Sequence, residues 1–134
     1  PEACQAAHEA GWDFMGHGWV QKPMHRVEDQ KSAIADTIRA IKDFTGKPPR
    51  GWESPGLTET DETLDLLAEA GIEYVADWVM DDQPVAIRTR GGSMVSVPYN
   101  DPDIGKMRYT AAFIARTPPP QAAGSSPPIS AGGA

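Results

Sequence analysis

The stretch RGWESPGLTETDETLDLLAEAGIEYVADWV, residues 50–79, decides the fold of this 134-residue chain. A short strand is predicted at residues 50–52, where it runs into a turn rich in glycine and proline. Residues 61–70 have helical spacing, and Gly71 ends that helix. Residues 72–79 alternate apolar or aromatic residues with others, which predicts a second strand. A strand, a helix and a strand in this order form the unit of a parallel sheet.

The flanking sequence extends this alternation in both directions. Upstream, we expect a short helix at residues 2–10, a short strand at residues 12–15 and a long helix at residues 26–44. In the long helix, one apolar stripe is formed by Val27, Ile34, Ile38 and Ile41, and Gly46 supplies the stop. Downstream, residues 85–90 and 94–99 are two short strands, which Gly91 and Gly92 would join into a hairpin. The elements therefore predict an α/β fold with a parallel sheet and crossover helices.

The chain divides into three parts by composition. Residues 1–100 carry the α/β pattern, and residues 101–116 fit neither helix nor strand clearly. Residues 117–134, TPPPQAAGSSPPISAGGA, consist almost entirely of proline, glycine, serine and alanine and carry no charge. Such a segment buries too little apolar surface to offset its ordering entropy, so we expect a disordered tail.

Composition narrows the classes of partner. The net charge of −7 and the absence of a basic stripe disfavour nucleic acid, so a small molecule or a sugar is the expected ligand. A single cysteine excludes an internal disulfide and a cysteine-based zinc cluster. No apolar run approaches transmembrane length and no signal peptide is visible, so we expect a cytoplasmic protein without membrane contact. Assembly into a homo-oligomer is compatible with this composition.

Polar and aromatic residues follow each of the three predicted strands. They occupy residues 16–19, residues 52–56 and residues 77–78. The carboxyl ends of parallel strands meet at one edge of a sheet, where the catalytic and binding residues of α/β proteins are found. This predicts one site assembled from three segments.

His17, Glu53 and Asp77 are the candidate catalytic residues of that site. A histidine between two glycines at a strand end can titrate near neutral pH; the alternative is a loop histidine that bonds backbone carbonyls. Glu53 and Asp77 can act as general base or orient His17. Their alternatives are a turn acceptor for Glu53 and a solvated strand end for Asp77.

Three tryptophans, Trp19, Trp52 and Trp78, stand in the same segments. They can line a substrate cleft, or they can belong to the core, where buried aromatic residues are more common. No phosphate-binding glycine loop and no serine nucleophile motif is present.

Taken together, the run from GHGWVQKPMH through RGWESPG to DWVMDD resembles the polysaccharide deacetylase (NodB-homology) superfamily. Within it, the chain is most similar to the allantoinase and urate-catabolism branch and its peptidoglycan-deacetylase relatives. The resemblance covers residues 13–99. It implies a distorted (β/α) barrel, of which this chain holds a part, and hydrolysis of carbon–nitrogen bonds other than peptide bonds, in an N-acetyl sugar or an allantoin-type ring amide.

Carried over residue by residue, His17 matches the first histidine of the family's H-x-x-x-H metal motif, and Gln21 stands where the second belongs. Arg50, Pro55 and Gly56 match the groove motif that contains arginine and proline, and Asp77 with Trp78 matches a second groove segment. These matches add Arg50 and Pro55 to the tryptophans as substrate-binding candidates.

Two family motifs are absent from the chain. The Thr-Phe-Asp-Asp type strand end, which supplies the base and a metal ligand, would lie before Pro1, and the late histidine motif is not recognisable after Tyr99. We therefore expect an incomplete hydrolase; the alternative is a non-catalytic binding module or an inactive truncated remnant. Zinc belongs to a complete relative, and with Gln21 in a ligand position we expect no tight zinc binding here, His17 being the one metal candidate.

Overall fold

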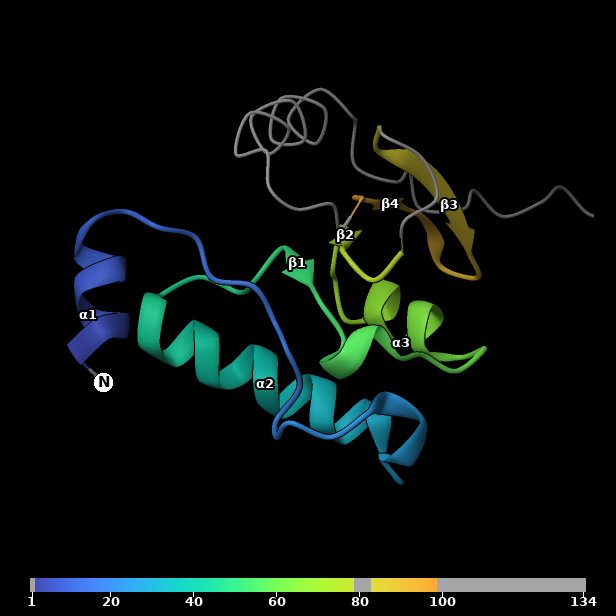
Figure 1. Cartoon of the computed structure of the whole chain (residues 1–134), viewed down its shortest axis with the longest axis horizontal. Coiled ribbons are helices and arrows are strands. Elements are labelled where there is room, and N and C mark those ends of the chain that lie inside the picture. Colours follow the sequence, from blue (N-terminus) through green and yellow to red (C-terminus); the bar gives the residue numbers. More distant parts are fainter. Residues whose placement is uncertain (1, 79–82, 99–134) are drawn as a thin grey trace, which may run out of the picture.

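The computed structural model describes residues 2–78 and 83–98 (Figure 1). Its helices are α1 (Glu2–Glu9), α2 (Gln30–Thr45) and α3 (Thr63–Glu69), with the short 3-10 helices η1 (Met24–Arg26) and η2 (Pro55–Leu57). Its strands are β1 (Gly51–Trp52), β2 (Tyr74–Val75), β3 (Val85–Thr89) and β4 (Gly92–Ser96). Residues 101–116 and the predicted tail at 117–134 lie outside the described ranges.

The strands form one sheet in the order β1-β2-β4-β3. Strands β1, β2 and β4 run parallel, with Trp52 opposite Val75 and Val75 opposite Ser96. Strand β3 pairs antiparallel with β4, which confirms the predicted hairpin, although Gly92 already lies in β4 opposite Thr89, so that the turn is formed by Arg90 and Gly91. The parallel sheet with helices on the crossovers confirms the α/β fold, and Figure 1 shows α2 and α3 together on one side of the strands.

The strand predicted at residues 12–15 does not form. Pairing is limited to Gly16, whose N–H donates to the Gly51 carbonyl at 2.9 Å and whose carbonyl accepts from the Glu53 N–H at 2.9 Å. Before it, Phe14 packs its ring against Phe44 of α2 with the ring centroids 5.7 Å apart, whereas Trp12 is 70% exposed. Phe14 thus makes its apolar contact with a helix rather than at the sheet edge, and residues 12–15 form no strand.

Helix α2 begins at Gln30, four residues later than predicted. Asp29 caps it, because its Oδ1 accepts a hydrogen bond from the Ser32 N–H at 2.9 Å. The helix ends at Gly46, as predicted, with φ of 80° in the left-handed region that glycine adopts freely. The predicted apolar stripe faces the core through Ile34, which is 2% exposed.

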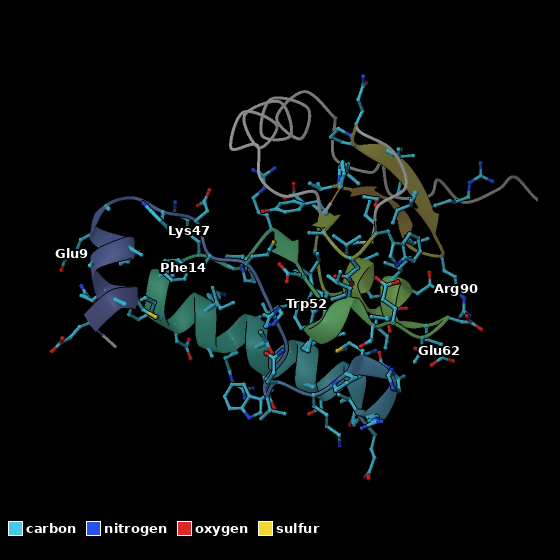
Figure 2. All side chains as sticks on the ribbon, in the orientation of Figure 1. Glu9, Phe14, Lys47, Trp52, Glu62 and Arg90 are labelled. Atoms are coloured by element: carbon cyan, nitrogen blue, oxygen red, sulfur yellow. The ribbon has the colours of Figure 1, made fainter. Side chains whose placement is uncertain are left out.

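The core lies between the sheet and helices α2 and α3. Trp52 is its largest fully buried side chain, and Figure 2 shows it close to α2. The buried cluster consists of Met24, Ile34, Trp52, Leu67, Ile72, Val75 and Met94. Because Trp52 ends β1, this core packs directly beneath the carboxyl ends of the parallel strands. None of the helices within the described ranges is long and apolar enough to cross a membrane.

Candidate active site

The carboxyl ends of β1 and β2 bring the three predicted catalytic residues to one edge of the sheet. His17 follows Gly16, which bridges Trp52 in parallel, and Glu53 follows Trp52 directly. Asp77 lies two residues beyond β2, whose last residue pairs with Trp52. The predicted placement of these residues at one end is confirmed, whereas their chemical roles stay predictions.

A single peptide group connects His17 to Asp77. The carbonyl of Glu53 lies 2.8 Å from His17 Nδ1, and the next N–H, that of Ser54, donates to Asp77 Oδ1 at 2.6 Å. The Glu53 carbonyl and the Ser54 N–H belong to the same peptide amide. His17 therefore contacts the negative end of the amide dipole, and Asp77 contacts its positive end. Sequence reasoning did not foresee a role for Ser54, because a backbone contact leaves no side-chain signal.

The carbonyl contact decides which nitrogen of His17 carries the proton. A carbonyl oxygen only accepts, so Nδ1 must donate, and the neutral ring then keeps its lone pair on Nε2. The side chain is 44% exposed, and the Glu53 carboxylate oxygen Oε1 lies 3.8 Å from Nδ1. His17 therefore bonds a backbone carbonyl, as in the alternative considered from the sequence, while its second nitrogen remains available for chemistry.

Asp77 is not the solvated strand end considered above. It is 4% exposed, and its Oδ2 atom is buried without a conventional hydrogen-bond partner. A nearby acid that the sequence did not single out, Glu59, also has a buried unpartnered oxygen, Oε1. Burial and the Asp77 carboxylate raise the pKa of Glu59 to about 9. The one available hint was its place in the turn between a strand end and a helix.

The tryptophans divide between the core and a cleft. Trp52 is 0% exposed and belongs to the core, whereas Trp19 is 58% exposed. Both line a cleft of about 320 Å³, together with Lys22 and Glu28, and this volume lies at the small end for ligand sites. Trp78 is half-buried and does not line this cleft.

Pro55 is a structural contact of this region. It is buried at the first position of η2, and its ring lies close to Gly18, because a Cβ added to Gly18 would come within 3.0 Å of Pro55 Cγ. The proline thus supports the loop that carries His17 and Trp19. Contact of Pro55 with a substrate stays a prediction.

Arg50 lies at the opposite end of the sheet from His17, so its predicted place in the same groove needs correction. It precedes β1, and its carbonyl accepts from the N–H of Glu73, which precedes β2. Its guanidinium donates to Glu73 Oε2 at 2.6 Å, and this bond raises the pKa of Arg50. In a parallel sheet, residues that precede the strands cannot share an edge with residues that follow them.

The described residues do not fit the zinc site of the family pattern. Within residues 2–78 and 83–98, no three side chains of His, Cys, Asp or Glu come together as a metal-binding group. Gln21, which stands in the position of the second histidine, is exposed, and a neutral amide is a poor zinc ligand. We therefore assign no step of the chemistry to a metal held by these residues.

Comparison with known proteins agrees with this arrangement. The chain belongs to the polysaccharide deacetylase family, whose model matches residues 1–75 of its 134 residues. Among solved structures, it is similar to a protein from Mycobacterium smegmatis that is provisionally described as a polysaccharide deacetylase. The two share 25% identity with a TM-score of 0.68, over 75% of this chain and 36% of that one.

Two further solved structures show the same similarity. The PuuE allantoinase shares 25% identity with a TM-score of 0.64, over 75% of this chain and 34% of that one. A Pseudomonas aeruginosa PAO1 protein, also provisionally described as a polysaccharide deacetylase, shares 26% identity with a TM-score of 0.63, over 75% of this chain and 35% of that one. No curated protein sequence matches the chain. The chain spans about a third of the length of these solved relatives.

Proposed function

We propose that this chain forms part of a hydrolase that cleaves a non-peptide carbon–nitrogen bond, with His17 as its general base. The observation that carries the proposal is the hydrogen bond from His17 Nδ1 to the Glu53 carbonyl at 2.8 Å. It leaves Nε2 as the basic nitrogen on a side chain that is 44% exposed. Family membership supports the reaction class, since deacetylases and allantoinases both hydrolyse such bonds.

The reaction adds water across the scissile bond. Nε2 of His17 would take a proton from water while its oxygen attacks the carbonyl carbon, and the carbon–nitrogen bond would break as that proton passes to the leaving nitrogen. The Glu53 carboxylate, 3.8 Å from Nδ1, would stabilise the imidazolium that forms between these two steps. N-acetyl sugars and allantoin-type ring amides are the two substrate classes that the resemblance implies, and a cytoplasmic location is part of the proposal.

The cleft beside Trp19 is the proposed place of the substrate; His17 does not line it but directly precedes Gly18, which does. An exposed indole beside Lys22 and Glu28 offers a flat apolar face with polar groups at its margin. Sugars and ring amides present the same combination of apolar faces and polar edges.

Release of acetate from N-acetylglucosamine oligomers and ring opening of allantoin are the assays. His17→Ala should lower the rate about 10²–10⁴-fold if His17 is the base. His25→Ala is the matched control, because His25 is also exposed but lies on η1. Binding of a substrate without turnover would identify the non-catalytic module instead, and equal rates in both variants would remove His17 from the mechanism.

A further inference from the structure

Two carboxyl oxygens of the site are buried without a conventional partner. They are Oε1 of Glu59 and Oδ2 of Asp77. Asp77 is 4% exposed, so bulk water contributes little to solvating this carboxyl group. Two ionised carboxylates cannot bond each other, whereas a carboxylic acid donates to a carboxylate. The carboxyl groups of Glu59 and Asp77 contact each other, so one proton held between them accounts for both unpartnered oxygens.

The backbone around Glu59 is held from both sides. Thr58 Oγ1 accepts a hydrogen bond from the Met24 N–H at 2.9 Å, and Thr60 Oγ1 accepts one from Gln30 Nε2 at 3.1 Å. These contacts tie the loop to η1 and to the start of α2. Glu59 lies between these two anchored threonines, so the loop has little freedom to move it away from Asp77.

Asp77 is the charged group that faces Glu59 among the described residues. Burial and this neighbouring carboxylate both favour the neutral form of Glu59, and they raise its pKa to about 9. The loop contacts from η1 and α2 come from uncharged groups, the Met24 N–H and the Gln30 amide. These contacts bring no positive charge to Glu59 and Asp77, so they do not offset the repulsion between the two carboxylates. A proton shared between Glu59 and Asp77 is the remaining way to relieve that repulsion.

We propose that Glu59 is a positioning residue that donates a hydrogen bond, as a neutral carboxylic acid, to Asp77 Oδ2. Asp77 is then fixed with Oδ1 on the Ser54 N–H, at 2.6 Å. A negative charge at the N–H end of the Glu53–Ser54 amide polarises its carbonyl, which strengthens the bond to His17 Nδ1. Glu59 therefore helps to set the tautomer of His17 without touching it.

The pairing can be tested without any turnover. The importance of the Glu59–Asp77 pair for catalysis rests on the proposed role of His17. The protonation of Glu59 does not depend on that role. A ¹³C carboxyl titration of the chain should give Glu59 a midpoint near 9. A midpoint near the ordinary value of 4.5 would overturn the proposal. Asp77→Asn should lower the Glu59 midpoint by about one unit or more, because it removes the adjacent charge.

A control and a second pair of variants complete the test. Glu62→Gln makes the same chemical change as Glu59→Gln on an exposed residue beyond the loop (Figure 2), and it should leave the Glu59 midpoint unchanged. Glu59→Gln keeps a donor toward Asp77, so the ¹⁵N shifts of His17 should still report a proton on Nδ1. Glu59→Leu removes the donor and should raise the fraction of the Nε2–H tautomer. Identical His17 shifts in the two Glu59 variants would show that Glu59 does not position the site.

Discussion

Gly16 lies against the buried indole of Trp52, and replacing it with alanine should destabilise the fold. A Cβ added at Gly16 would stand 2.3 Å from Trp52 Cε3 and 2.7 Å from Cζ3. Carbon atoms pack at about 3.5–4.0 Å, so the ring would have to move by roughly 1 Å or more. Trp52 is 0% exposed and its Nε1 donates to Ser54 Oγ at 3.1 Å, so such a movement would strain the core and that bond.

Gly16 itself cannot retreat, because its N–H and carbonyl both bond the β1 segment at 2.9 Å. Overpacking of this kind costs about 1–3 kcal/mol. For a domain of this size, the midpoint of thermal unfolding should fall by roughly 4–8 °C for each kcal/mol. Urea and thermal unfolding of Gly16→Ala, followed by circular dichroism, would measure the loss.

Gly91→Ala is the matched control for this variant. Its added Cβ would meet the nearest atom, Ala68 Cβ, at 3.9 Å, which is an ordinary contact, and Gly91 is not among the residues with positive φ. The free energy of unfolding should therefore change by no more than about 0.5 kcal/mol. If Gly16→Ala were equally neutral, the close approach of Gly16 to Trp52 would be wrong, and with it the placement of His17.

Three further predictions concern charge and capping. Folding raises the pKa of Glu59 from 4.5 to about 9. The contribution of Glu59 to the free energy of unfolding should therefore be complete below pH 4.5 and lost as pH rises toward 9. In urea unfolding at stepped pH, Glu59→Gln should make the free energy of unfolding less dependent on pH. Asp29→Ala removes the cap on the Ser32 N–H and should lower the free energy of unfolding by about 1 kcal/mol; an unchanged urea midpoint would contradict the cap. Arg50→Ala breaks an exposed pair with Glu73 and should change stability by about 0–1 kcal/mol and leave the His17 spectrum unchanged, since it lies at the other end of the sheet.

Sequence patterns were enough to predict those helices and strands whose formation depends on residues close together in the sequence. The apolar stripe and the glycine stop predicted α2, because helical periodicity and left-handed glycine act within a few turns. The Gly91-Gly92 pair predicted the β3–β4 hairpin for the same reason. The alternation of strands and helices predicted that His17, Glu53 and Asp77 lie at one end of a parallel sheet, since that rule depends only on chain order.

Burial and charge pairing were decided by the tertiary structure. Residues 12–15 have the composition of a strand, yet nothing in the described fold covers Trp12, so the pairing stops at Gly16. In the sequence, Glu59 is one of several acidic residues in a turn. Only its proximity to Asp77 in the fold makes it a site residue. Arg50 was assigned to the groove by motif, whereas its ion pair with Glu73 holds it at the far end. A side chain's exposure and its partners depend on which distant segments meet, and neither periodicity nor turn chemistry carries that information.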